Sequence, residues 1–524
     1  MKRTCTILII SAAAIAAASC SKDSIGSDPN VADDSTLSHG CIVLGDKLDN
    51  PYTVANYQAA YASLYPTKAR DAISTTDLYV RFLPSDDTQL ETLKSLGLTL
   101  VDHPVDYTII RDGDYYHDPS LDEESITWQY AVVPVDFTFP KSIRYEVLDE
   151  CYLSENSPST KAMTDVDWDA VERESYRLTG NASMLHPLTK GGRANPSGRV
   201  TIVDEECNGG QPVGVAGVKV MCNVFVKFSS TYTDRDGYYS IPKAFSSDVR
   251  YRLVFSNSKG FAIGFNLIIL PASVSTLGKA SPEGTDVYVD KNSDRALFRR
   301  CVVNNAAWEY FERCGEDDLN IGATPADIRI WCLENMECSS ALMLHHGTVL
   351  SSSDGSKFFQ IAAFIVKLFG PDITLGTGAS DTYAKLYSQT VHELAHATHF
   401  GKVGVDYWNQ YMLYIVKSYL STGSLYGDAS QENSGYCRVG EMWAYYMESK
   451  LYQERYGVEN PAYGSQYWFH PQMLTSLEDR GLSPAQILAA MDSDVTDAEL
   501  LKKKLISLYP SKQTVIEQIF LRYE

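Results

Sequence analysis

The sequence lacks three features that would assign it to common classes of protein. After Ala18, no segment approaches the roughly 18 uninterrupted apolar residues of a membrane-spanning helix. Positive charge is scarce, with 45 Lys and Arg against 66 Asp and Glu and a net charge of −21. No basic stripe is available to offset phosphates, so the composition excludes nucleic acid as a partner. No C-x-x-C motif indicates a thiolate metal site.

Apolar and aromatic residues, in contrast, are plentiful. The chain is 44% hydrophobic, with 34 Tyr and 18 Phe in 524 residues, which is enough to bury sizeable cores. This length indicates about three domains. Nine cysteines follow Cys20, an odd number, so at least one is free and the pairing of the others stays open.

The N-terminus has the features of an export signal. A short positive region, Met1–Arg3, precedes the apolar run Ile7–Ala18, which is too short to span a bilayer comfortably. The run ends in Ala17-Ala18-Ser19-Cys20, which resembles the lipobox of bacterial lipoproteins. The resemblance implies that residues 1–19 are a signal peptide and that Cys20 is lipidated. A plain signal peptide cleaved nearby is the alternative.

The segment after the lipobox predicts where the protein is located. Residues 20–40 are polar and contain Gly, Pro and several Asp, as expected of a flexible, lipidated tether. Ser21-Lys22-Asp23-Ser24 resembles the export tag that sends some Gram-negative lipoproteins to the outer face of the outer membrane. We therefore expect a cell-surface protein whose partner is the outer membrane, through an N-terminal lipid anchor.

Residues 41–192 are predicted to form an α+β domain of unknown role. Leu78–Phe82 reads as a strand, Asp86–Leu96 as a capped helix and Leu98–Val101 as a second strand. Thr127–Phe139 adds further alternating strand signal. Strands and a helix in this order favour an α+β fold.

Residues 196–290 change to the two-residue period of β-strands. Alternating segments at 198–204 and 212–220 precede a D-x-D-G turn, Asp234–Gly237, inside a third segment at 233–242. These pieces in this order resemble the carboxypeptidase regulatory-like domain, a seven-stranded immunoglobulin-like β-sandwich. The resemblance implies a structural or docking module without catalytic residues.

The chemically most informative stretch is His392-Glu393-Leu394-Ala395-His396, an H-E-x-x-H motif. Apolar residues recur around it at helical spacing, and Gly401 follows where a helix commonly ends. Residues four apart share one face of a helix, so both imidazoles can bind one zinc ion. Glu393 is placed to take a proton from metal-bound water as the general base.

A catalytic zinc site needs a third protein ligand. His399 lies seven residues after His392, about 10.5 Å along a helix axis, which is too far for both to hold one ion. The metzincin pattern H-E-x-x-H-x-x-G-x-x-H also fails, because His399 occupies its glycine position and Lys402 its last histidine.

A second predicted helix begins near Val439 and supplies a better candidate. The H-E-x-x-H motif and this helix resemble the gluzincin metallopeptidases, whose third ligand is a glutamate in a G-E-x-x-A setting. Glu441 and Ala444 match that arrangement. The resemblance implies zinc (Zn2+) bound by His392, His396 and Glu441.

The match to the gluzincins has departures that leave alternatives open. Tyr445 stands where some members place an aspartate that orients a ligand histidine. Glu448 is the fallback metal ligand and Glu432 a weaker one. The donor to the transition-state oxyanion stays open among four candidates, Tyr436, Tyr445, Tyr446 and His470.

Residues 291–524 are predicted to form a zincin-like domain, which makes the whole chain a multidomain α+β protein. A helix at 295–314, strands at 327–333, 340–344 and 372–376, the metal helix, a helix near 407–420 and later helices follow in the zincin order. In zincins an edge strand beside the cleft pairs with an extended substrate.

The sequence thus predicts a surface-anchored zinc metallopeptidase, an endopeptidase that hydrolyses protein or peptide substrates with Glu393 as general base. The alternative is a catalytically inactive zincin-like lipoprotein that binds a protein or glycan partner at the cell surface. A third hypothesis is a structural surface protein in which the sandwich and the N-terminal domain carry the function.

Overall fold

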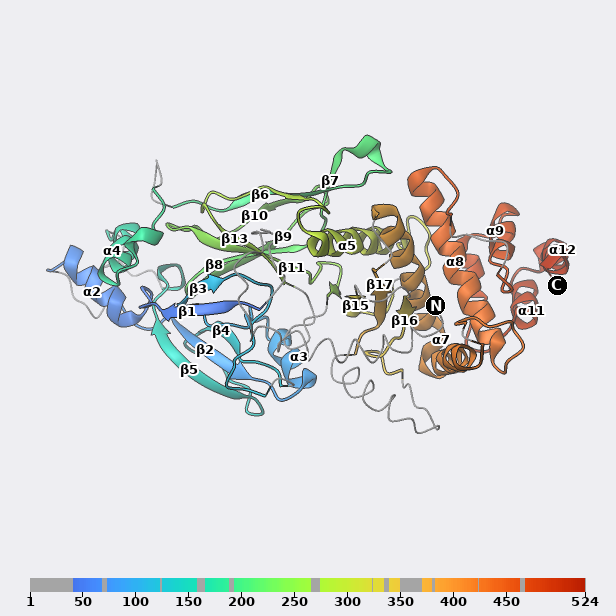
Figure 1. Cartoon of the computed structure of the whole chain (residues 1–524), viewed down its shortest axis with the longest axis horizontal. Helices are drawn as coiled ribbons and strands as arrows, with labels where there is room; N and C mark the ends of the chain where they lie inside the picture. The colour runs from blue at the N-terminus through green and yellow to red at the C-terminus, as the bar shows by residue number, and fades with distance from the viewer. Residues whose placement is uncertain are drawn as a thin grey trace, which may run out of the picture.

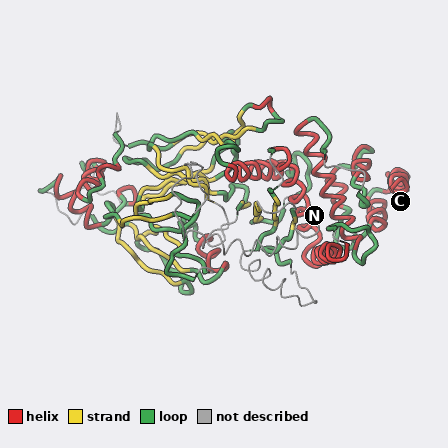
Figure 2. Tube along the Cα trace, in the orientation of Figure 1, coloured by secondary structure: helices red, strands yellow, loops and turns green. Residues whose placement is uncertain are grey.

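The computed structural model describes residues 41–67, 73–122, 125–157, 165–187, 193–264, 274–322, 324–333, 339–348, 370–378, 382–422, 424–461 and 467–523. The predicted signal peptide, Cys20 and the tether lie outside these residues. The molecule is an elongated α+β protein, with its larger sheets towards one end and a mainly helical part at the other (Figures 1 and 2). Among the described helices, none is both long and apolar enough to cross a membrane.

The N-terminal part is built on a small antiparallel sheet of order β4-β2-β5, with bounds Gln129–Pro134, Asp77–Leu83 and Arg144–Cys151. Helix α3 (Asp87–Ser95) begins where predicted, because the Asp86 side chain accepts a hydrogen bond from the Gln89 backbone N–H. Strands β1 (Val43–Lys47) and β3 (Tyr107–Arg111) form a separate pair, and helices α2 (Val54–Leu64) and α4 (Trp168–Leu178) pack together.

The predicted strand at Leu98–Val101 is wrong. Only Val101 pairs, in a single bridge with Tyr130. Leu98, Thr99 and Leu100 form no bridge with another described strand. The segment lines a cavity instead.

Two further sheets follow, one above the other in Figure 1. The first has the order β10-β6-β14 with β7 also on β6, and the second is antiparallel with the order β13-β11-β8-β9. The bounds are β6 Ser197–Val203, β7 Pro212–Gly214, β8 Lys219–Val224, β9 Lys227–Tyr232, β10 Tyr238–Ser240, β11 Val249–Val254, β13 Val274–Ala280 and β14 Val287–Val289. Val200, Ile202, Val220 and Leu253 from both sheets are fully buried in one hydrophobic core.

A further sheet, of order β12-β15-β17-β16, contacts helices of the helical part. Strands β12 (Phe261–Ile263), β15 (Ile328–Leu333) and β17 (Ile373–Gly376) are parallel, and β16 (Ser340–Ala341) is antiparallel at the edge. The expected strand at 340–344 is therefore shorter than predicted, because Met343 has a φ of 55° and the chain turns there. In the sequence, β12 follows β11 and precedes β13. The predicted range 196–290 therefore contributes one strand to this sheet.

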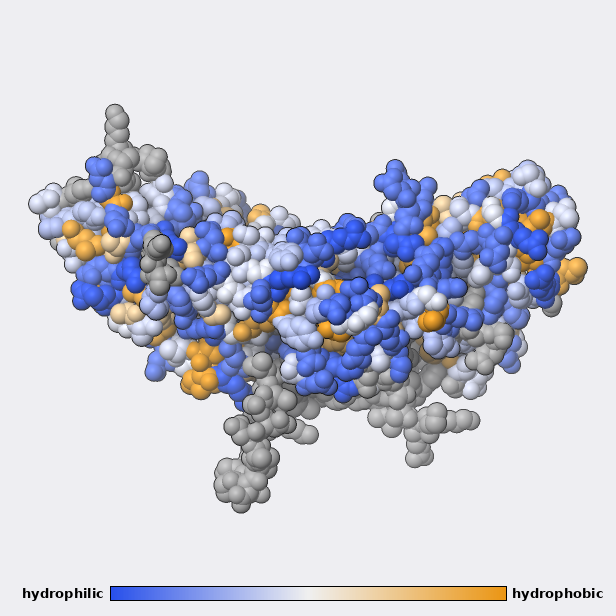
Figure 3. All heavy atoms as spheres, turned by 90° about the horizontal axis from the view of Figure 1, so that it is seen from above, coloured by the Kyte–Doolittle hydropathy of each residue, from blue (hydrophilic) through white to orange (hydrophobic). Residues whose placement is uncertain are grey.

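The helical part consists of α5 (Arg295–Arg313), α7 (Tyr383–Thr422), α8 (Ser434–Tyr456) and four shorter helices. These are α9 Gln472–Asp479, α10 Pro484–Ala489, α11 Ala498–Leu508 and α12 Gln513–Tyr523. Helix α7 packs against both α5 and α8 (Figure 1). The surface seen in Figure 3 is mostly hydrophilic with small scattered apolar patches, in keeping with the net charge of −21.

Helix α7, which carries the H-E-x-x-H motif, breaks at Gly404 and does not end at Gly401, where the sequence predicts its end. Helical structure continues through Gly401 to Thr422, but Gly404 has a φ of 81° and a ψ of 179°. This backbone region is open almost only to glycine. The separate helix predicted near 407–420 is the second half of α7.

We expect Gly404→Ala to lower the free energy of unfolding by about 1–3 kcal/mol, because alanine is strained at this φ and ψ. Chemical denaturation monitored by circular dichroism measures the change. Gly401→Ala is the matched control, because Gly401 is exposed and helical. A β-carbon at Gly401 would lie 3.4 Å from the Pro325 ring, which is an ordinary contact. This variant should be neutral or stabilising by up to about 1 kcal/mol. Equal effects of both variants would contradict a break at Gly404.

Candidate metal centre

Helix α7 presents both motif histidines on one buried face. His392 and His396 are one turn apart, and their ring centroids are 4.8 Å from each other. Val391, Leu394 and Ala395 are fully buried, which fixes the rotation of the helix and turns the histidines towards α8. The motif is therefore part of an interior helix and not of a solvated surface.

Helix α8 brings Glu441 to the same place. Gly440, the residue before it, faces the His396 and Tyr411 rings, and a β-carbon there would be in ordinary van der Waals contact with both, at 3.8–3.9 Å. The Trp443 indole N–H donates to the carbonyl of Ala395 over 3.1 Å and locks the two helices together.

The distances among the three side chains suit one metal ion. The Glu441 carboxylate lies 3.4 Å from His392 Nε2 and 3.6 Å from His396 Nε2. Two ligand atoms about 2.0–2.1 Å from a tetrahedral zinc ion are about 3.3–3.4 Å apart. In the described part of the chain, this is the one group of three or more potential ligands close enough to hold an ion.

Two unsatisfied oxygens support the same assignment. Oε2 of Glu393 is buried and has no hydrogen-bond partner among the described residues, and the buried Oε2 of Glu441 has only the His392 ring, 3.4 Å away and outside hydrogen-bond geometry. A buried carboxylate oxygen without a partner costs free energy, which a bound cation would recover. The residues present thus fit a metal ion, and the buried triad could hold one.

The charges at the site are strongly coupled. Burial alone would raise the pKa of Glu441, but the neighbouring His396 and His392 hold it well below its usual value. Burial alone would lower the pKa of His392, but its contacts with Glu441 and Glu448 raise it far above 6.5. Glu441 is therefore ionised, as binding of a metal ion would require.

Glu393 has the opposite electrostatic setting. Burial, together with the charges of Glu441 and Glu448, raises the pKa of Glu393 to about 8, against the effect of His392. A backbone interaction with Ala341 acts to lower this pKa. The Glu393 carboxylate is thus influenced both by the charges of the triad and by the backbone of the edge strand β16.

Glu448, the fallback ligand of the sequence interpretation, has a different place. It contacts Nδ1 of His392 over 2.9 Å, on the side of the ring away from Glu441. Ser388 donates to Glu448, and the Asn460 amide donates to Glu448 Oε1 over 3.1 Å and to Ser388 over 2.7 Å. Glu448 therefore orients His392, one of the candidate ligands, which is the role that the sequence left without a residue at Tyr445.

The spacing of Glu448 could have revealed this role. It lies seven residues, or two helical turns, after Glu441, so both carboxylates share one face of α8. The weaker candidate Glu432 is exposed and is not among the residues that could hold an ion. His399 is likewise not among them: it is buried beside the Tyr407 and Trp408 rings, and burial lowers its pKa to about 3.

The four candidate oxyanion donors separate in space. The Tyr446 hydroxyl donates to Glu478, the Tyr436 ring packs on Tyr407, and the His470 ring packs on Tyr523. Of the four, the Tyr445 ring lies nearest to the motif, 4.5 Å from the His392 ring.

Tyr411 is a site residue that the sequence reasoning missed. Its hydroxyl donates to Oε1 of Glu441 over 2.5 Å, and burial raises its pKa well above 10. It comes from the second half of α7, which folds back beside the triad only because of the break at Gly404. No local sequence signal marks it.

Comparison of the chain with protein-family models, with curated proteins and with solved structures gives no match.

We expect the purified protein to bind about one zinc ion per chain, and His396→Ala and Glu441→Ala to lose it. Glu448→Gln should keep the ion with about 10–100-fold weaker affinity, because the variant removes the carboxylate that orients His392. Mass spectrometry of metal content and chelator competition measure both effects.

Glu432→Gln is the control for the loss of an exposed carboxylate on the same polypeptide, and its affinity should equal that of the wild type. If Glu441→Ala retained its zinc while Glu448→Gln lost it, the assignment of the third ligand and of the orienting residue would be reversed.

Proposed function

We infer that the protein is a zinc-dependent metallopeptidase whose site is the buried triad His392, His396 and Glu441 with Glu393 beside it. The observation that carries this proposal is the combination of ligand spacing suited to one ion and a buried carboxylate next to it without a partner for Oε2. This constellation suits hydrolysis of a carbonyl substrate by activated water.

The residues have distinct roles in the proposed reaction. A bound zinc ion would polarise the substrate carbonyl and lower the pKa of water. Glu393 accepts the proton of the attacking water and later donates it to the leaving amine. Glu448 holds His392 in position through Nδ1, and Tyr411 holds the Glu441 carboxylate.

The edge strand favours a peptide as the substrate. Among the described residues, β16 pairs only with β17, and its Ala341 interacts with Glu393. A peptide in extended conformation that lies along β16 would bring a backbone carbonyl close to the triad. An internal peptide bond then fits the proposed endopeptidase activity.

The finer architecture belongs to the same proposal. We interpret residues 291–524 as a zincin-like domain and residues 196–290 as an immunoglobulin-like sandwich of the carboxypeptidase regulatory type. The sandwich would dock or space the catalytic part, and residues 41–192 keep an unassigned role. Lipidation at Cys20 would anchor the protein to the outer membrane at the cell surface.

One observation favours the second candidate function, a catalytically inactive lipoprotein that binds a protein or glycan partner. The His392 side chain is 10% exposed, and those of His396 and Glu441 are 3% exposed. An ion held in so closed a site would serve structure as well as catalysis. The unpartnered Oε2 of Glu393 is the argument against this candidate, because a structural site needs no such base.

We expect the zinc-loaded protein to cleave peptides, and Glu393→Gln to lower kcat by about 100- to 10,000-fold at unchanged zinc content, because the general base is lost. A mixed peptide library analysed by mass spectrometry gives the cleavage rate. Chelation should abolish cleavage and zinc should restore it. A zinc-loaded wild type that cleaves nothing, or an equally active Glu393→Gln, would leave the binding lipoprotein as the better account.

A further inference from the structure

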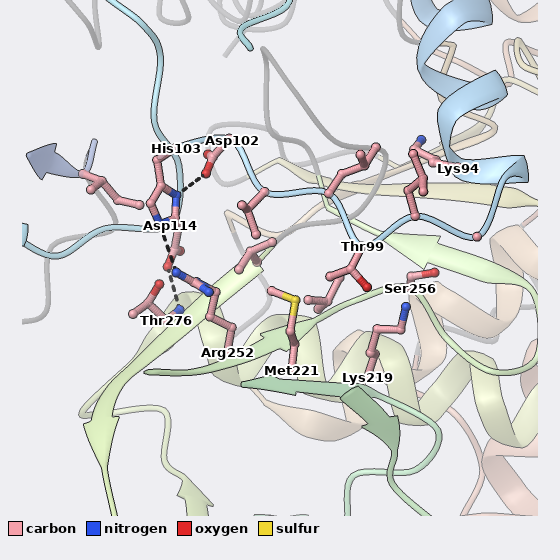
Figure 4. Close-up of a pocket in the computed structure, with 17 residues that line it drawn as sticks. Lys94, Thr99, Asp102, His103, Asp114, Lys219, Met221, Arg252, Ser256 and Thr276 are labelled. Atoms are coloured by element: carbon pink, nitrogen blue, oxygen red, sulfur yellow. Dashed lines mark hydrogen bonds and ion pairs between the residues drawn. The ribbon is translucent and has the colours of Figure 1, made fainter. Parts of the chain in front are cut away.

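A cavity of about 260 Å³ lies between the N-terminal part and the sheet β13-β11-β8-β9 (Figure 4). The segment 97–103, which contains the predicted strand 98–101, forms one wall, and residues of β8, β11 and β13 form the other. None of the metal-centre residues lines it. Cavities between domains are common positions for small-molecule sites, although this one is smaller than the usual range of about 300–1,000 Å³.

One end of the cavity contains a buried cation bound only to neutral groups. Arg252 is 2% exposed and donates to Asn223 Oδ1 over 2.7 Å and to His103 Nε2 over 3.0 Å. Since a guanidinium can only donate, His103 Nε2 accepts, and Nδ1 carries the proton that is donated to Asp102 over 2.7 Å. His103 is therefore neutral, and Asp102 is the nearest anion in this chain of contacts.

The other end contains an ammonium group without a counter-ion. Lys219 on β8 lines the cavity, and in Figure 4 its amine lies towards Thr99 and Ser256. Within the described residues, no hydrogen bond or ion pair to the Lys219 amine is present. The amine lies 5.5 Å from the centroid of the Tyr232 ring. Burial lowers its pKa, as expected when no anion offsets the loss of water.

The remaining charges that line the cavity are already paired. Lys94 lies 2.7 Å from Glu91, and Asp114 lies 2.9 Å from Arg300. Asp102 offsets one of the two remaining cations, Arg252 and Lys219, so the cavity carries one excess positive charge. This is unusual in a chain whose net charge is −21.

We propose that this cavity binds a small monocarboxylate with an apolar body. The carboxylate pairs with the Lys219 amine, and the apolar body packs against the cavity residues Leu98, Leu100, Met221 and Val254. A single excess charge and a single unpaired ammonium match one carboxylate, whereas a phosphate dianion would need more donors. Such ligands include a peptide end with its free α-carboxylate and a short fatty acid.

Isothermal titration calorimetry with N-acetylleucine, octanoate and N-acetylleucinamide tests the proposal on the whole protein. At least one of the two acids should bind, and the uncharged amide should bind about 10–100-fold more weakly than N-acetylleucine if the peptide-like acid is the ligand. Binding of octanoate alone would identify the fatty-acid source of the same chemistry. Failure of both acids at millimolar concentration would overturn the proposal.

Variants test which group binds the carboxylate of the ligand. Lys219→Met keeps the apolar stem but removes the charge, and it should weaken the bound acid by about 10–100-fold. Lys94→Met is the matched control: it removes a lysine that lines the same cavity but is paired with Glu91, and it should leave the affinity unchanged. Equal affinity of the wild type and Lys219→Met would contradict the assignment.

A measurement on the wild type keeps the test decisive if Lys219→Met does not fold. The bound acid should slow chemical acylation of Lys219, read by mass spectrometry, while acylation of Lys94 stays unchanged. Unchanged acylation of Lys219 at saturating acid would overturn the proposal.

Discussion

The candidate metal centre depends on the packing of α8 against the histidine face of α7. That contact buries the Glu441 carboxylate between two imidazoles, where an unpaired charge would be costly. The contact is held by apolar burial and by the Trp443 hydrogen bond to Ala395. Any change that moves α8 by one residue would turn Glu441 away from the histidines.

The rest of the molecule restrains this pair of helices. Arg455, near the end of α8, binds Asp204 at the end of β6 over 2.9 Å and also pairs with Glu309 on α5. Asp204 is fully buried, so removing Arg455 would leave an uncompensated charge. The sheet that contains β6 is thereby fixed to α8. Glu448, on the same helix, holds the His392 ring through Nδ1. Beyond the break at Gly404, the second half of α7 supplies Tyr411, whose hydroxyl donates to Glu441.

The sequence predicted the parts of the site that depend on local spacing. His392, Glu393 and His396 follow from helical periodicity, whereas Glu441 follows from a family resemblance. In the structure, Glu441 lies close enough to both histidines to share one ion with them. Tyr411 escaped prediction because its position results from a backbone break and from tertiary packing, which leave no local pattern. The strand expected at 98–101 failed because pairing partners, and not alternation, decide whether a strand forms.

X-ray absorption spectroscopy at the zinc edge tests the central claim most directly, because it reports the atoms bound to the ion. The claim predicts two imidazole nitrogens and a carboxylate oxygen at about 2.0–2.2 Å. Replacement of Glu441 by alanine should remove the carboxylate contribution. A sulfur ligand at about 2.3 Å, or fewer than two imidazoles in the wild type, would contradict the triad as the metal site.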